Sequence, residues 1–186
     1  MTMLFALEAS FRNVNTTRKR IALCTPGVSS EARDTMTKLN IEVRGITQPQ
    51  SDKFNTEISR WKDTLSKFAI FQMQDIEKFV YLDLDIIVLS NMDYLFDLPT
   101  KSLIHGMTDG TECDKGPLGM NAGLLVGSPN QTLYTELFKL LDESDTKEIT
   151  KKGDQSMMNE YFKRTYVTTC LLTHLTSRKR ITFTRD

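Results

Sequence analysis

The sequence has little cysteine, and its three cysteines, Cys24, Cys113 and Cys170, are too far apart to form a metal knuckle. Their odd number predicts free thiols in a reducing compartment, and therefore a cytoplasmic location. No apolar run reaches the roughly 18 residues that span a bilayer, and the first residues lack the basic start and cleavage pattern of a signal peptide. The sequence gives no reason to expect a membrane partner.

The chain also lacks an excess of charge, with 24 basic and 24 acidic side chains among 186 residues. A neutral total removes the general electrostatic reason to expect nucleic acid as a main partner. Hydrophobic residues make up 39% and charged residues 26%, which excludes collagen-like and low-complexity classes. A folded chain with a core of its own is expected at this length.

Internal repeats and linkers rich in proline, glycine or serine are absent as well. What is present is an alternation of short apolar runs with segments of helical periodicity, which predicts an α/β layered sheet. The most apolar run, residues 79–89, does not alternate, as expected of a central parallel strand covered on both faces. The other predicted strands are 21–24, 41–46, 102–107 and 121–128, and the predicted helices include 3–11, 29–39, 60–73 and 131–144.

The last 24 residues, 163–186, differ in character from the rest. They hold six basic residues, one acidic residue and seven threonines, whereas residues 1–162 hold 18 basic and 23 acidic residues. We expect a divergent basic, threonine-rich tail after residue 162. Its interpretations are an exposed basic end, an anion-binding tail, or a segment that does not belong to the fold.

Two acidic residues, Asp83 and Asp85, directly follow the apolar residues 79–82. In an open α/β sheet, ligands gather beyond the carboxyl ends of strands, and side chains two residues apart on extended backbone point to the same side. Two unpaired carboxylates there would repel each other and be costly to desolvate. A divalent cation removes that cost, and oxygen ligands suit Mg²⁺ or Mn²⁺ with open positions for substrate phosphates. The plain alternative is two solvated carboxylates at a strand-to-loop boundary.

Four stretches follow one another in a recognisable order: TLSKF, FVYLDLDIIVL, NAGLLVGSP and GDQSMMNEYF. In this order they resemble family 8 of the retaining glycosyltransferases, the group that contains glycogenin and galactinol synthase. The resemblance covers about residues 4–162. It implies a Rossmann-like, A-type nucleotide-diphospho-sugar transferase fold, with a mostly parallel central sheet flanked by helices. The implied reaction moves a hexosyl group from a UDP-sugar to a carbohydrate, polyol or protein acceptor.

The resemblance assigns the donor and metal site by position. Asp83 and Asp85 would hold Mn²⁺ (or Mg²⁺) against the UDP diphosphate, with Leu84 between them in the donor site. Lys67, sixteen residues before Asp83, would contact the donor. Taken alone, a lysine on an amphipathic helix is most often solvated.

The resemblance also assigns three residues to the sugar side of the site. Asn121 would face the sugar or the acceptor, and Asp154 would lie near the anomeric carbon with Gln155 beside it. Their plainer interpretations are local: Asn121 as a turn former before Ala-Gly, and Asp154 as a helix N-cap.

The chain departs from the family pattern in two places, so the resemblance implies a partial catalytic domain, residues 1–162, shortened at both ends. Family members begin with a strand and a loop that cradle the uracil and ribose, and here the first segment resembles the helix that follows them. A late H-x-x-G-x-x-K-P-W segment, which supplies a histidine ligand to the metal, is absent. His174 does not match it and receives no role.

Two other interpretations compete with the active transferase. One is an inactive or partner-dependent fragment of the same fold. The other is a phosphohydrolase of the haloacid dehalogenase type, which would use Asp83 as a nucleophile. Against the phosphohydrolase, Ile87 stands where that class has threonine or valine, and the late acidic motif lacks its second aspartate.

Overall fold

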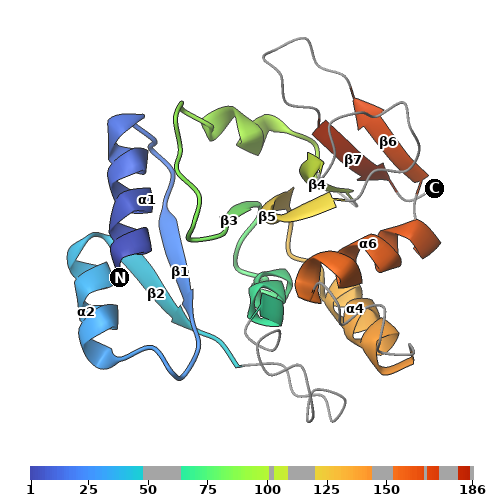
Figure 1. Cartoon of the computed structure of the whole chain (residues 1–186), viewed down its shortest axis with the longest axis horizontal. Helices are drawn as coiled ribbons and strands as arrows, with labels where there is room; N and C mark the ends of the chain where they lie inside the picture. Colours follow the sequence, from blue (N-terminus) through green and yellow to red (C-terminus); the bar gives the residue numbers. More distant parts are fainter. Residues whose placement is uncertain are drawn as a thin grey trace.

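The computed structural model describes residues 1–47, 64–100, 103–108, 120–143, 153–165, 167–171 and 180–184. They form two sheets with helices beside them (Figure 1). The helices are α1 (Thr2–Asn13), α2 (Ser30–Lys38), the 3₁₀ helices η2 (Thr64–Gln72) and η3 (Asp93–Asp97), α4 (Gln131–Glu143) and α6 (Gly153–Thr165). The strands are β1 (Arg20–Cys24), β2 (Ile41–Gly45), β3 (Phe79–Leu82), β4 (Leu103–Thr108), β5 (Met120–Gly127), β6 (Val167–Leu171) and β7 (Arg180–Thr184).

Residues 1–47 form a small layer of their own, which we call the N-terminal layer. Strands β1 and β2 pair in parallel and are connected along the chain by α2, as the alternation of strand and helix predicts. Ser29 begins α2 by accepting a hydrogen bond from the Ala32 N–H at 3.2 Å, and Glu31 and Lys38 lie at the ends that the helix dipole favours. The core of the N-terminal layer is a small buried cluster of Leu4, Cys24, Met36 and Ile41.

The other sheet has five strands in the order β3-β5-β4-β7-β6, and all four of its pairings are antiparallel. The expectation of a mostly parallel sheet is therefore corrected: among the described pairs, only β1–β2 is parallel. Continuous apolar residues report that a strand is covered on both faces, and they do not report its direction. This set of strands with η2, α4 and α6 is called the main layer below.

The core of the main layer lies between its sheet and the helices η2, α4 and α6. Phe68, Phe71 and Leu137 are fully buried there, together with Met157 and Met158 of α6. The helix predicted at 60–73 corresponds to η2, and residues 60–63 lie outside the described residues. Lys67 is therefore carried on a helix whose neighbouring residues are almost all buried, so its ammonium group is held inside the protein.

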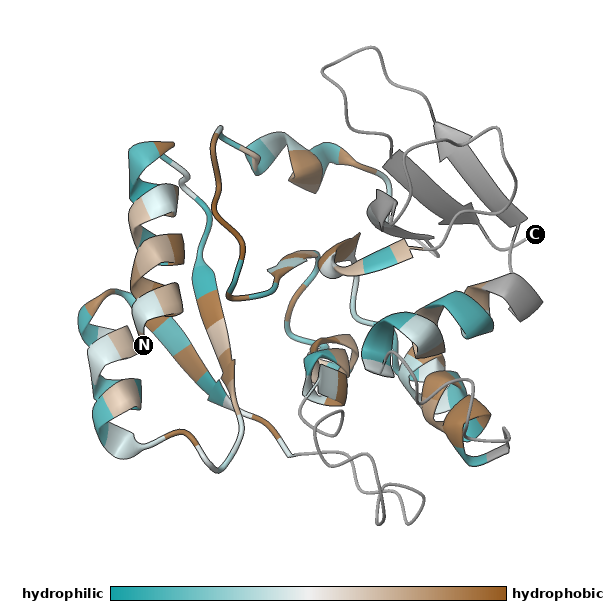
Figure 2. Cartoon of the chain, in the orientation of Figure 1, coloured by the Kyte–Doolittle hydropathy of each residue, from teal (hydrophilic) through white to brown (hydrophobic). Residues whose placement is uncertain are grey.

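Of the apolar run 79–89, only residues 79–82 form strand β3, which ends at Leu82 directly before Asp83. The N–H of Ile86 approaches the Asp83 carbonyl at 3.3 Å, which closes a turn directly after the strand. The apolar run continues beyond that turn in the loop leading to η3 (Figure 2), where Ile87 and Leu89 are 59% and 83% exposed. The apolar residues on both sides of Asp83 and Asp85 do not mark this end, whereas the two acidic residues between them do.

Residues 163–186 contribute two strands, β6 and β7, and β7 pairs with β4. A boundary after residue 162 stays a prediction, and α6 runs across it to Thr165. Cys24 is a buried free thiol, as expected, whereas Cys113 lies outside the described residues. None of the described helices has both the length and the apolarity that a membrane span needs.

Candidate active site

The ammonium group of Lys67 joins two carboxylates that lie far apart in the sequence. Its Nζ lies 3.0 Å from Asp83 Oδ1 and 2.6 Å from Asp154 Oδ2. It also donates a hydrogen bond to the Ala122 carbonyl at 3.1 Å. Residues from η2, the end of β3, β5 and the start of α6 therefore meet at one atom. Lys67 is 8% exposed and Asp154 7% exposed, so the Lys67–Asp154 pair is shielded from water.

Tyr81 supports this group from the strand side. Its hydroxyl donates to Asp83 Oδ1 at 2.8 Å, and Lys67 Nζ lies 5.3 Å from the centre of its ring. Burial, followed by the negative charge of Asp83, raises the pKa of the Tyr81 phenol well above its ordinary value. The raised pKa favours the protonated phenol, which donates the hydrogen bond to Asp83.

Asp154 owes its position to the start of α6. Gly153 begins this helix with a φ of 60°, a left-handed conformation that glycine adopts without a steric penalty. The carboxylate then lies in the first turn, where the helix dipole stabilises negative charge. Gln155 follows in the same turn and is half-buried. Asp154 thus lies in the first turn of α6 and also contacts Lys67.

Asn121 lies close to Asp83 across the backbone of Gly123. Its Oδ1 accepts the Gly123 N–H at 2.8 Å, and the Gly123 carbonyl accepts the Asp83 N–H at 2.9 Å. A Cβ placed on Gly123 would lie 2.9 Å from Asn121 Oδ1 and 3.3 Å from Asp83 Oδ2. Glycine is thus required for Asn121 and Asp83 to approach each other this closely.

Asp85 and Leu84 lie on the solvent side of the group. Both are exposed, and no hydrogen bond or ion pair of Asp85 occurs within the described ranges. Asp85 lies within the turn that the Asp83 carbonyl and the Ile86 N–H close, so the expectation of two carboxylates on one side of an extended strand does not apply to this pair. The rule applies one step earlier, since Tyr81 and Asp83 share a face and are hydrogen-bonded.

The side chains near Asp83 limit how a metal ion could be bound at this site. Within the described ranges, no three histidine, cysteine or acidic side chains are placed to hold one. Asp83 is also not unpaired, as the sequence argument assumed, because Lys67 and Tyr81 meet its desolvation cost. Two carboxylates and substrate phosphates are nevertheless the ligands that Mg²⁺ accepts in proteins, so Asp83 and the exposed Asp85 fit such an ion. The group contains the ammonium of Lys67 and the carboxylates of Asp83, Asp85 and Asp154. Two of the three negative charges therefore have no positive charge within the group to balance them.

Sequence reasoning missed three contributors: Tyr81, Gly123 and the carbonyl of Ala122. Tyr81 could have been found, because a residue two before Asp83 on a strand points to the same side. Gly123 carried a signal too, since a glycine within a strand often marks a close approach of backbone or side chain. The Ala122 carbonyl had no signal, because every residue has one.

Comparisons with known proteins identify the family of this chain. The family model of Glycosyl transferase family 8 matches residues 3–169. The chain is 29% identical over 174 residues to human glycogenin-1, covering 91% of this chain and 46% of glycogenin-1. It is 34% identical over 118 residues to galactinol synthase 1 of Solanum lycopersicum, covering 54% of this chain and 36% of that protein.

Solved structures show the same fold class. The apo form of the glycosyltransferase GlyE of Streptococcus pneumoniae superposes with a TM-score of 0.64 at 21% identity, over 88% of this chain and 40% of GlyE. The architecture is therefore the Rossmann-like α/β fold of glycosyltransferases, as predicted. With the family match over most of its length, the chain belongs to glycosyl transferase family 8. It spans about half or less of the length of the relatives named here.

Proposed function

We propose that this chain forms the donor-handling part of a glycosyltransferase that transfers a hexosyl group from a UDP-sugar to a carbohydrate, polyol or protein acceptor. The observation that carries the proposal is the shared contact of Lys67 with Asp83 and Asp154. It brings three of the four resembling stretches to one point, and Gly123 adds the fourth through Asn121.

The charges suit the chemistry of breaking a bond between a sugar and a diphosphate. Negative charge develops on the departing phosphate oxygens and positive charge on the sugar ring. The Lys67 ammonium stabilises the first, and the buried Asp154 carboxylate stabilises the second. Because Lys67 and Asp154 are held by the fold before any substrate arrives, little reorganisation is needed during the reaction.

Mn²⁺ or Mg²⁺ belongs to the proposal as a cofactor held by Asp83 and Asp85. When bound, it would act as a Lewis acid on the diphosphate. Asp83 is oriented for this by the Tyr81 hydroxyl and by Lys67, and Asp85 is free to turn toward an ion. The two uncompensated negative charges favour a cation at this place, whereas an anionic diphosphate alone would be repelled.

The test is calorimetric binding of UDP in the presence of MnCl₂, followed by release of UDP from UDP-glucose. We expect Asp83→Asn and Asp85→Asn to abolish metal-dependent UDP binding. Asp97→Asn is the matched control, because Asp97 is an exposed aspartate in η3. Equal UDP affinity in all three variants would contradict the proposal.

The same measurements separate the remaining alternative. An inactive fragment that keeps the donor site would bind UDP with Mn²⁺ and release none from UDP-glucose. A partner-dependent fragment without a donor site would bind neither. The phosphohydrolase interpretation has lost its support, since the family match runs through all four stretches. A cytoplasmic location and the absence of a nucleic-acid or membrane partner stay predictions.

A further inference from the structure

Asn159, in α6, ties that helix to the first residue of β5. Its Oδ1 accepts the Met120 N–H at 2.6 Å, and its Nδ2 donates to the Met120 carbonyl at 3.1 Å. One side-chain amide thus bonds both backbone groups of a strand residue, as a neighbouring antiparallel strand would. Since α6 also packs against β5 (Figure 1), this pair of hydrogen bonds fixes how the helix and the strand lie relative to each other.

Met120 has little freedom to move away from this contact. Its side chain is fully buried. A Cβ placed on Gly106 of β4 would lie 2.5 Å from both the Cγ and the Sδ of Met120. The Met120 side chain therefore packs directly onto the backbone of β4, where only glycine leaves room for it. Met120 is thus held from one side by β4 and from another by Asn159.

The pairing of β5 with β4 is interrupted soon after β5 begins. Asn121 and Leu125 pair with adjacent residues of β4, so residues 122–124 lie between two neighbouring pairs. We call these three residues the β5 bulge. Extra residues in one strand leave the hydrogen-bond ladder and turn their backbone groups elsewhere. In the β5 bulge, the Ala122 carbonyl accepts its hydrogen bond from Lys67 Nζ at 3.1 Å.

These contacts form a closed cycle through the candidate site. Lys67 Nζ lies 2.6 Å from the Asp154 carboxylate and 3.1 Å from the Ala122 carbonyl. Asp154 lies at the start of α6, and Asn159 follows in the same helix. Asn159 then returns to β5 through Met120, two positions before Ala122. Asn159 therefore sets the spacing between two groups that bind the same ammonium.

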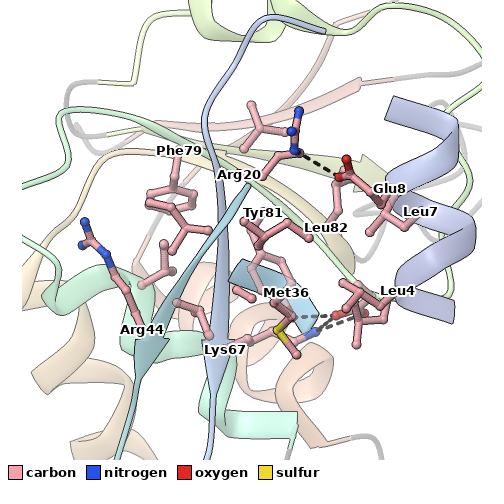
Figure 3. A pocket seen from close by; sticks show the side chains of 18 of the residues that line it. Leu4, Leu7, Glu8, Arg20, Met36, Arg44, Lys67, Phe79, Tyr81 and Leu82 are labelled. Carbon is pink, nitrogen blue, oxygen red and sulfur yellow. Dashed lines mark hydrogen bonds and ion pairs between the residues drawn. The ribbon is translucent and has the colours of Figure 1, made fainter. Parts of the chain in front are cut away.

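Asn159 acts from outside the cavity into which the candidate site opens. This cavity has a volume of about 1530 Å³, and its lining includes Lys67, Asp83 and Asp154. Figure 3 shows Lys67 and Tyr81 among the side chains that line it. Asn159 is not among the described residues of the lining. A donor bound in the cavity would meet the groups that Asn159 holds in place, and not Asn159 itself.

We propose that Asn159 is a positioning residue for the sugar side of the transfer reaction. It holds the β5 bulge at the distance from α6 at which Ala122 and Asp154 bind Lys67 together. Apolar packing between α6 and β5 has no preferred direction, whereas two hydrogen bonds from one amide fix both distance and orientation. A displacement of about 1 Å at reacting groups can lower a rate by on the order of 100-fold. The effect on rate rests on the proposed function, but the geometry can be measured without turnover.

Asn159→Ala is the variant that tests this role, because it removes both hydrogen bonds to Met120. Its matched control is Asn130→Ala. Asn130 is also half-buried, and its Oδ1 accepts the Leu133 N–H at 3.0 Å at the start of α4. Each variant thus loses an amide that bonds backbone, and only Asn159 belongs to the cycle. Thermal unfolding checks that both variants fold and measures how much stability each one loses.

The first measurement is NMR of the lysine ammonium groups in the ¹⁵N-lysine-labelled chain without substrate. Burial and three partners slow the exchange of the Lys67 ammonium protons with water, which makes its signal observable. The loss of that signal in Lys67→Arg assigns it. We expect the signal to shift or disappear in Asn159→Ala and to stay in place in Asn130→Ala.

The second measurement is UDP release from UDP-glucose with MnCl₂, together with UDP affinity by calorimetry. Asp83 keeps its hydrogen bond from Tyr81 in Asn159→Ala, so we expect UDP affinity to change by less than about threefold. The kcat should fall about tenfold or more, because the groups on the sugar side are displaced. In Asn130→Ala, both quantities should stay within about twofold of the unaltered chain.

Three results would overturn the inference. They are an unchanged Lys67 signal in folded Asn159→Ala, losses of kcat and UDP affinity of equal size in that variant, and equal losses of kcat in both variants. The two proposals also fail separately. If the unaltered chain neither binds UDP nor releases it from UDP-glucose, the proposed function is wrong, and the Lys67 signal still decides whether Asn159 positions the β5 bulge.

Discussion

The N-terminal layer and the main layer differ in what they contribute to the candidate site and in how far their ion pairs are buried. Within the described ranges, the partners of the Lys67 ammonium come from the main layer and from Asp83 directly after β3. The N-terminal layer lines the same cavity as Lys67, Asp83 and Asp154. Ion pairs differ in the same way. The Lys67–Asp154 pair is buried, and the Arg44–Asp75 pair, which joins the layers, includes a carboxylate that is 64% exposed. The same kind of interaction is thus shielded from water at the candidate site and largely exposed at the contact between the layers.

The largest expected effect on the free energy of unfolding comes from replacing Lys67, and replacing Arg44 gives the comparison between the two ion pairs. Lys67→Met leaves the buried Asp154 carboxylate without its partner, which we expect to lower the free energy of unfolding by about 3–5 kcal/mol. Arg44→Met breaks a pair that water screens, so a much smaller loss is expected. Urea unfolding of both variants measures the difference. Similar losses would show that burial does not distinguish the two pairs.

A second prediction concerns the Tyr81 hydroxyl. Tyr81→Phe keeps the ring under Lys67 and removes the hydrogen bond to the Asp83 carboxylate, which should cost about 1.5–3 kcal/mol. Calorimetry should also show weaker binding of UDP with Mn²⁺, because Asp83 loses a group that orients it. Thr37→Val is the control in the N-terminal layer, since that hydroxyl only donates to the Arg33 carbonyl within α2. Unchanged UDP affinity in Tyr81→Phe would separate Tyr81 from the site.

A third prediction compares two glycines in strands. The Cβ in Gly123→Ala would meet Asn121 and Asp83, and we expect a loss of about 1 kcal/mol, since the exposed Asn121 can move. In β2, Gly45 has nothing within 4 Å of such an atom, so Gly45→Ala should stabilise by about 0.5–1 kcal/mol. Thermal unfolding of both variants measures the shifts. Destabilisation by Gly45→Ala would contradict the difference between the layers.

The smallest effect is a pH dependence at the contact between the layers. Hydrogen bonds from Thr16 and Thr17, with the charge of Arg18, lower the pKa of Asp93. A lowered pKa means that this stabilisation is present above the ordinary carboxyl value, about 3.9, and is lost as the pH falls through the folded value. The melting temperature of Asp93→Asn should therefore approach that of the unaltered chain as the pH is lowered below 4. A constant gap over that range would exclude this origin.

The sequence predicted the local features well, because each depends on neighbours along the chain. The cap at Ser29 and the charge order of α2 follow from a few adjacent residues. The apolar run at 79–82 forms a strand as expected, but its end at Leu82 depends on the turn that Asp83 and Ile86 close. Strand direction was also beyond the pattern, since a covered strand is apolar whichever way it runs.

For the candidate site, the sequence by itself determined which side chains exist and in what order the family stretches follow. Only the tertiary structure decided how they share partners. Lys67 and Asp154 are 87 positions apart in the numbering, and packing of η2 against α6 is what brings them within 2.6 Å. The same packing pairs Asp83 with a lysine and leaves Asp85 in water. The sequence cannot show this difference, because both residues are aspartates and they lie only two positions apart. Burial and partners are properties of the folded chain, because they depend on residues distant in sequence.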